Sequence, residues 1–168
     1  MTNIKIGFDF YIVILKKTDM KINKELKVSL GLINEKLHFK GVSRKNEPIS
    51  IDYIPPLGDN LGYTSLELFL FSISSCIAST ILIFLRKENK IISAININAS
   101  AIRKEEHPTG LRNVDINIEI DSQNLTNQEM ESVIKKSKEE YCPVISMLNK
   151  DVQVAVNYEI IKERRHVE

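Results

Sequence analysis

Alternating hydrophobic and polar positions dominate the N-terminal third of the chain. From Leu26 to Leu32 the apolar residues occupy every second position, a period typical of a strand with one covered face. The segments LHFKGVS and PISIDYI are also strand-like, and the turn-forming sequence SRKNEP separates them. The pattern predicts three consecutive strands in an antiparallel meander, which ends at the loop PPLGDNLGY.

The pattern then changes to an apolar segment from Leu68 to Leu85, eighteen residues without a charge. Eighteen helical residues span about 27 Å, close to the thickness of a bilayer core. Five of them are Ser or Thr, however, and predicted strands flank the segment in the sequence. We therefore favour a buried helix over a membrane span, with a single-span membrane protein as the alternative. Thr64 and Glu67 form a capping-box pattern at its start.

The remaining segments alternate between strand and helix patterns. SAININASAI, VDINIEID and VQVAVNYEII have strand patterns, and LTNQEMESVIKKSKEEYCPVISMLNK has a helical one with Asn124 or Thr126 as its N-cap. Strands that stand before, between and after two helices, without strict βαβ alternation, predict an α+β fold.

Composition and charge exclude several classes of protein. The chain has 168 residues, 43% of them hydrophobic and 27% charged, which is typical of one soluble globular domain. A net charge of +1 gives no electrostatic reason to bind nucleic acid or a membrane surface. The N-terminal apolar run FYIVIL is only six residues long and predicts no signal peptide. We expect a cytoplasmic protein with no nucleic-acid or membrane partner.

The two cysteines are the candidates for chemistry. Cys76 and Cys142 lie 66 positions apart and the histidines are scattered, so no metal site is expected. Cys76 lies on a helix face of small residues and, taken alone, is typical of a buried structural cysteine. Cys142 precedes Pro143, which should kink or restart the helix. The free amides of a new helical turn would lower the pKa of the Cys142 thiol, whereas an inert cysteine at a proline kink is the alternative.

These segments resemble those of a known family. TSLELFLFSISSC and EEYCPVISMLNKDVQVAVNYEII resemble the two cysteine helices of the OsmC/Ohr family, the osmotically inducible protein C and organic hydroperoxide resistance proteins, and AIRKEEHPTGLRNVDINIEI resembles the hairpin between them. The likeness is to a less characterised OsmC-like branch. It defines an OsmC-like domain at residues 25–161, a polar tail at 162–168, and an N-terminal extension at 1–24 that is either an extra strand or an incorrectly assigned start.

The resemblance implies an α+β intertwined homodimer in which antiparallel sheets wrap around two central cysteine-bearing helices. It also implies a thiol-dependent peroxidase that reduces organic hydroperoxides without metal, haem or flavin. By position, Cys76 would attack the peroxide and become a sulfenic acid, and Cys142 would resolve it as a disulfide. An external dithiol would then reduce this disulfide.

The chain departs from the family pattern at two supporting positions. The family arginine in the first strand turn is absent, because that turn reads INEKL and carries Lys36; Arg44, one turn later, is the remaining candidate. The family glutamate stands ten residues before the first cysteine, where this chain has Leu66. Glu67 is a second candidate, although its spacing places it on the opposite side of the helix from Cys76 and favours the capping role. These departures support an alternative function, a redox-responsive or small-molecule-binding protein without peroxidase activity.

Overall fold

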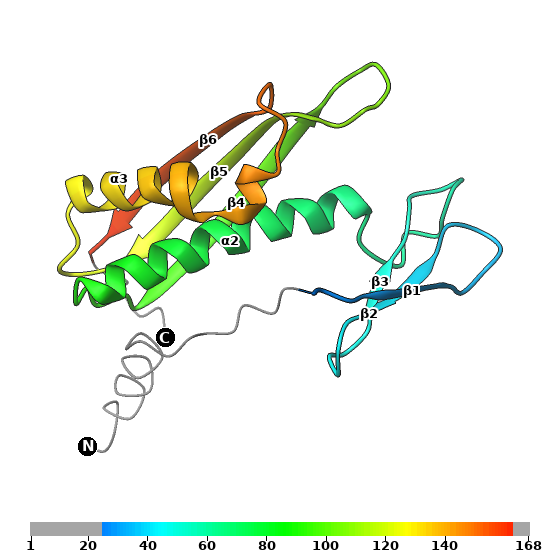
Figure 1. Ribbon diagram of the computed structural model, residues 1–168, viewed down its shortest axis with the longest axis horizontal. Coiled ribbons are helices and arrows are strands. Elements are labelled where there is room, and N and C mark those ends of the chain that lie inside the picture. The colour runs from blue at the N-terminus through cyan, green and yellow to red at the C-terminus, as the bar shows by residue number, and fades with distance from the viewer. Residues whose placement is uncertain (1–24, 163–168) are drawn as a thin grey trace.

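The computed structural model describes residues 25–162 and shows an α+β fold of two three-stranded sheets and a group of helices (Figure 1). The predicted extension at residues 1–24 and the tail residues 163–168 lie outside the described part. The first sheet consists of β1 (Ser29–Leu32), β2 (Phe39–Val42) and β3 (Ile49–Ile51). The second consists of β4 (Ala94–Arg103), β5 (Leu111–Asp121) and β6 (Gln153–Ile161).

The helices lie between these strands in the sequence. One long helix, α2 (Ser65–Lys87), connects the two sheets. A broken helical segment connects β5 to β6 and consists of α3 (Asn127–Lys136), the π-helix η1 (Ser137–Tyr141) and the single turn α4 (Pro143–Ser146). In Figure 1, α2 and α3 lie along the β4–β6 sheet, and the β1–β3 sheet stands at the N-terminal end of α2. The α+β class and all six predicted strands are confirmed.

Sheet topology follows the predicted meander with one difference. Strands β1, β2 and β3 pair antiparallel in sequence order, and β4 pairs antiparallel with β5. Strand β6, however, pairs parallel with β5, so the second sheet is mixed rather than antiparallel. The reason is the long crossover through α3, η1 and α4, which returns the chain to the end of the sheet where β5 began.

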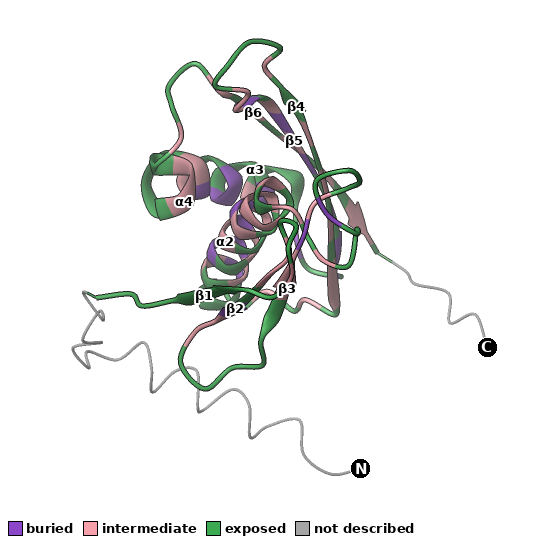
Figure 2. Ribbon diagram, turned by 90° about the vertical axis from the view of Figure 1, so that its right-hand side faces the viewer, coloured by how far each residue is buried: buried purple, intermediate pink, exposed green. Residues whose placement is uncertain are grey.

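The core lies between α2 and the inner face of the β4–β6 sheet. Helix α2 buries a stripe of residues four positions apart, and β5 buries alternate residues (Figure 2). These fully or almost fully buried side chains are Ile73, Ile77, Ile81 and Leu85 on α2 and Val114, Ile116, Ile118 and Ile120 on β5. By length and composition alone α2 would suffice to cross a membrane. Its buried stripe packs against the β4–β6 sheet, so α2 also serves as the core helix of this α+β fold.

Both major helices begin with a capping box. At α2 the Thr64 hydroxyl accepts from the Glu67 backbone N–H at 3.3 Å, and the Glu67 carboxylate accepts from the Thr64 N–H at 2.7 Å. Thr126 and Glu129 form the same arrangement at α3. The capping role predicted for Glu67 is confirmed, and of the two candidate caps of the second helix it is Thr126 that serves.

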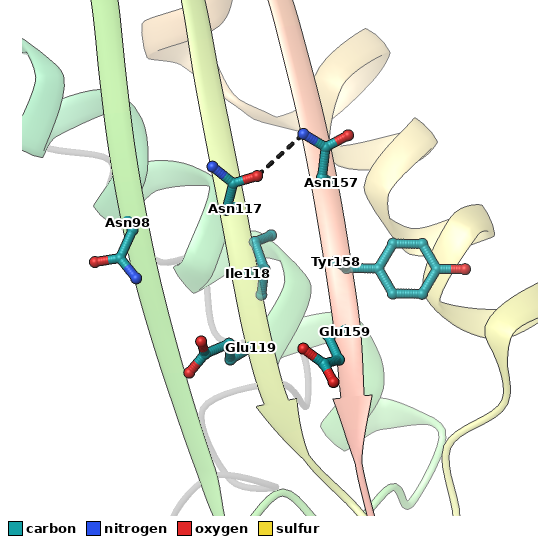
Figure 3. A pocket seen from close by; sticks show the side chains of 7 residues that line it. All are labelled: Asn98, Asn117, Ile118, Glu119, Asn157, Tyr158 and Glu159. Atoms are coloured by element: carbon teal, nitrogen blue, oxygen red, sulfur yellow. Dashed lines mark hydrogen bonds between the residues drawn. The ribbon is translucent and has the colours of Figure 1, made fainter.

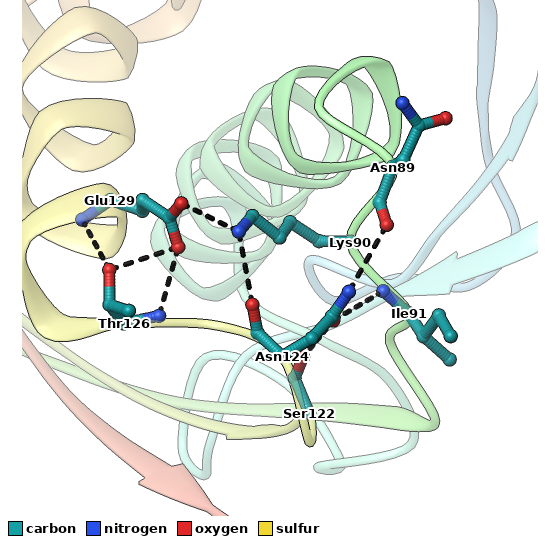
Figure 4. A network of polar contacts seen from close by, with 7 residues as sticks. All are labelled: Asn89, Lys90, Ile91, Ser122, Asn124, Thr126 and Glu129. Atoms are coloured by element: carbon teal, nitrogen blue, oxygen red, sulfur yellow. Dashed lines mark hydrogen bonds and ion pairs between the residues drawn. The ribbon is translucent and has the colours of Figure 1, made fainter.

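Asn124 instead joins the end of α2 to the start of α3 (Figure 4). Its side chain accepts from the Ile91 N–H at 2.9 Å and donates to the Asn89 carbonyl at 3.2 Å. Lys90 extends this network, donating to the Asn124 carbonyl at 3.0 Å and pairing with Glu129 at 2.6 Å. The two cysteine-bearing helical segments are therefore tied together at the end remote from the β1–β3 sheet.

The loop before α2 is organised around a buried carboxylate that the sequence pattern did not reveal. Asp52 is fully buried and accepts backbone N–H groups of Tyr53 at 2.8 Å, Asp59 at 3.1 Å and Leu61 at 2.9 Å. The chain passes so close to this carboxylate that a Cβ atom on Gly58 would lie 2.1 Å from its Oδ1. Asp52 thus fixes the conformation of the loop that directly precedes the N-cap of α2.

We expect acid to destabilise the protein through this carboxylate. Burial opposes ionisation of Asp52, but the N–H groups of Leu61, Tyr53 and Asp59 outweigh it and hold the pKa below its usual 3.8. A pKa lowered by folding contributes stability above about pH 4, and this stability is lost as the pH falls through the folded-state pKa. Urea unfolding midpoints from pH 7 to pH 3 should therefore decline more steeply in the wild type than in Asp52→Asn.

The Asp52→Asn variant should also have a lower urea unfolding midpoint than the wild type at pH 7, because an amide is a weaker acceptor than a carboxylate for the three N–H groups. Glu47→Gln is the matched control, since Glu47 is an exposed residue in the turn before β3. Parallel acid profiles for the wild type and Asp52→Asn would contradict this role of Asp52.

Candidate thiol site

The fold brings the two cysteines into contact. Cys76 lies in the middle of α2 and is partly exposed, whereas Cys142 lies at the N-cap of α4 and is only 3% exposed. Both thiols are free, and their sulfurs are 2.7 Å apart, with Cys142 as the donor. A disulfide requires about 2.05 Å. The pair can therefore join with little movement of either helix.

A break in the second helical segment places Cys142 at this point. The backbone N–H of Cys142 bonds the Ser137 carbonyl five residues back at 3.0 Å, which is the π-helical pattern. Cys142 is then extended, with φ −88° and ψ 101°, and Pro143 starts the next turn. The predicted restart of the helix at Cys-Pro is confirmed. The buried hydroxyl of Ser137 donates to the Val133 carbonyl at 2.8 Å and is thereby satisfied.

The predicted effect of this restart on acidity is wrong. Burial and the contact with Cys76 raise the pKa of the Cys142 thiol to about 11. The amides of Ile145 and Val144 do lower it, as expected for a helix start, and the Ile145 N–H approaches the sulfur at 3.5 Å. Desolvation outweighs them because the turn is short and the sulfur is almost fully covered. Cys142 is therefore a neutral thiol at physiological pH.

The two other candidate residues are not brought to the thiols. Glu67 is engaged by Thr64 at the α2 cap, and these hydrogen bonds lower the pKa of its carboxyl below the usual 4.5. Arg44 lies exposed in the β2–β3 turn at φ 56°, and no described contact joins it to either cysteine. Lys36, which stands in the turn of the family arginine, forms an ion pair with Asp59.

A hollow in the outer face of the second sheet is a separate feature (Figure 3). It contains a row of asparagines, in which Asn157 donates to Asn117 at 3.1 Å, and Glu119 and Glu159 are register partners on β5 and β6. Neither glutamate forms an ion pair within residues 25–162. The hollow contains no thiol, and no metal-binding group of His, Cys, Asp and Glu occurs in the described part of the chain.

Fold and site together define a dithiol protein with an α+β fold, in which two cysteine-bearing helical segments cover a mixed three-stranded sheet. The family model for OsmC-like protein matches residues 58–157, more than half of the chain. The chain therefore belongs to the OsmC-like protein family. The resemblance read from its cysteine segments is confirmed.

Individual relatives are distant. Protein YhfA of Escherichia coli K12 is 24% identical over 127 residues, covering 76% of this chain and 92% of that protein. An OsmC-like protein from Mycoplasma pneumoniae has a TM-score of 0.71 at 19% identity, over 84% of this chain and all of that one. An organic hydroperoxide resistance protein from Elizabethkingia anophelis has a TM-score of 0.63 at 16% identity, over the same share of each chain. At these identities the two structures establish the fold.

Proposed function

We propose that the protein is a thiol-dependent peroxidase that reduces organic hydroperoxides through Cys76 and Cys142. The observation that carries this proposal is the contact of the two thiols at 2.7 Å between α2 and α4. Membership of the OsmC-like family supports it, as does the fold shared with an organic hydroperoxide resistance protein. The partly exposed Cys76 is the thiol that a substrate can reach, and the covered Cys142 is suited to the second step.

In the first step the Cys76 thiolate attacks the terminal oxygen of the hydroperoxide. The S–O bond forms as the O–O bond breaks, and the alkoxide takes up a proton and leaves as an alcohol. Cys142 then attacks the sulfenic sulfur of Cys76, its thiol proton departs with the hydroxyl as water, and a disulfide forms. An external dithiol reduces this disulfide by thiol–disulfide exchange and is itself oxidised.

Intact mass and free-thiol count test the cycle directly. One equivalent of cumene hydroperoxide should remove both thiols and lower the mass by about 2 Da, the loss of two hydrogens on disulfide formation. Cumene hydroperoxide should react faster than hydrogen peroxide, because apolar side chains around Cys76 desolvate an organic group. Faster oxidation by hydrogen peroxide would contradict the substrate class. Two unreactive thiols would favour the alternative, a ligand-binding or redox-responsive protein without peroxidase activity.

The same proposal includes a homodimer, as in the family resemblance. The strand β1 is exposed along its length in the single chain (Figure 2). Exposed apolar residues also occur in the loops beside this sheet and near the start of α2. Leu30 is 59% exposed, Leu32 57% and Phe71 57%. Leu30 and Leu32 lie on one face of β1, because side chains two positions apart share a face, and exposed apolar side chains grouped in this way are typical of an interface. We expect a second copy of the chain to cover this face.

A further inference from the structure

The first sheet leaves one long side of β1 without a neighbouring strand. The order of this sheet is β1–β2–β3, so β1 pairs with β2 on one side and with no strand of residues 25–162 on the other. The Ile33 N–H bonds the His38 carbonyl at 2.9 Å, so the backbone groups of Ile33 face the β2 side. Because backbone groups alternate in direction along a strand, the N–H and C=O groups of Leu30 and Leu32 point to the open side. An edge of this kind is a template for a further strand.

The segment that leads into β1 is exposed as well. Leu26 and Val28 continue the alternation of Leu30 and Leu32 toward the N-terminus, and they are 89% and 80% exposed. A Cβ atom added to Gly31 would meet no atom within 4 Å. Residues 26–32 therefore have open space beside them and apolar side chains against which a further strand can pack.

Residues 4–14, which precede this edge in the sequence, have the pattern of such a strand. Apolar and other residues alternate strictly in IKIGFDF, residues 4–10, and the apolar run YIVIL follows. The even positions from Ile4 to Ile14 are all Ile or Phe, whereas the first odd positions are Lys, Gly and Asp. The pattern predicts a strand with one apolar face, rich in the residue types that strands favour.

The length of the connection and the spacing of the apolar residues allow this segment to return along β1. Residues 15–25 separate Ile14 from Leu26 and include four lysines, and they are more than an antiparallel hairpin needs. If Ile14 stands opposite Leu26, every even position of one strand stands opposite an even position of the other, and Phe10 stands beside Leu30. The apolar positions of the two strands then lie on the same face of the sheet.

We propose that residues 4–14 form a fourth strand that pairs antiparallel with the open edge of β1 in the same chain. Its backbone bonds the N–H and C=O groups of Leu30 and Leu32, and its even-numbered side chains extend the apolar face of the sheet. This pairing uses the edge of β1, whereas the proposed second copy of the chain covers the face. The added strand also blocks the edge against pairing with unrelated chains. The inference does not depend on the thiol chemistry.

Hydrogen exchange of single amides, followed by NMR in the full-length protein, tests the pairing. In the wild type the N–H groups of Leu30 and Leu32 should exchange slowly, because a paired amide exchanges only when the strand opens. Phe8→Asp places a carboxylate on the apolar face of the proposed strand and should speed exchange at both amides about 10-fold or more. The control Lys5→Asp introduces the same residue on the opposite face of the same segment and should leave both rates unchanged.

The origin of any protection is settled by cross-strand NOEs in a mixture of isotope-labelled and unlabelled chains. NOEs between Phe10 and Leu30 within one chain are expected. NOEs between chains only would assign the strand to the second copy and overturn the inference. Rapid exchange of Leu30 and Leu32 in the wild type would show that the edge is open. Slow exchange that Phe8→Asp does not change would show that another element covers it, and either result also overturns the inference.

Discussion

Replacing Cys76 by serine is expected to abolish hydroperoxide turnover, with a loss of several orders of magnitude. A serine hydroxyl is not ionised at physiological pH and cannot accept the peroxide oxygen as a stable sulfenic acid does. The substitution is nearly isosteric at a partly exposed position of α2, so the fold should be retained. The measurement is steady-state reduction of cumene hydroperoxide with an excess of external dithiol, beside far-UV circular dichroism of the variant.

The Cys142→Ser variant is the matched control, and its expected behaviour differs in kind. One equivalent of hydroperoxide should still consume the Cys76 thiol and add about 16 Da, the mass of one oxygen in a sulfenic acid, because only the resolving step is lost. Steady-state turnover should fall strongly, since no intramolecular disulfide can form. Equal loss of the first oxidation in both variants would overturn the assignment of roles.

A charge placed in the exposed apolar sheet should separate the proposed dimer. Leu30→Glu introduces a carboxylate into β1 where a second copy is expected to bind, and burying it unpaired costs about 3 kcal/mol or more, at least a hundredfold in Kd. Light scattering coupled to size exclusion should give twice the chain mass of 19.2 kDa for the wild type and close to that mass for the variant.

Ser29→Glu is the control, because successive strand residues point to opposite faces and both residues are exposed in the single chain. It should remain dimeric. A wild-type protein of 19.2 kDa in solution would refute the homodimer, whatever the variants do. Monomeric behaviour of both variants would show instead that β1 tolerates charge on neither face.

Hydrophobic periodicity was sufficient to predict the fold class, the order of the strands and the start of α2. These features depend on local pattern, such as the Thr64 and Glu67 capping box, whose partners are three residues apart. The parallel pairing of β6 with β5 was not predictable in this way, because it depends on how a crossover of three short helical pieces folds back.

The same distinction between local pattern and tertiary contact applies to the candidate site. The helix restart at Cys142 follows from Pro143 alone and was predictable, whereas the pKa of Cys142 depends on the side chains that cover it and was predicted with the wrong sign. The buried role of Asp52 was missed for the same reason, since its partners are backbone amides, which leave no trace in the sequence.

The chain packs tightly around the Asp52 carboxylate, and this packing limits which amino-acid substitutions the loop can accept. At Gly58 and Gly62 an added Cβ would come within 2.1 and 2.5 Å of neighbouring atoms, so neither position accepts a side chain without rebuilding the loop. Gly31 in β1 has open space around it and carries no such restriction. Random substitution across residues 52–62 should therefore be tolerated unevenly. We expect substitutions of Asp52, Gly58 and Gly62 to be tolerated least, and those of exposed loop residues such as Leu57 to be tolerated best.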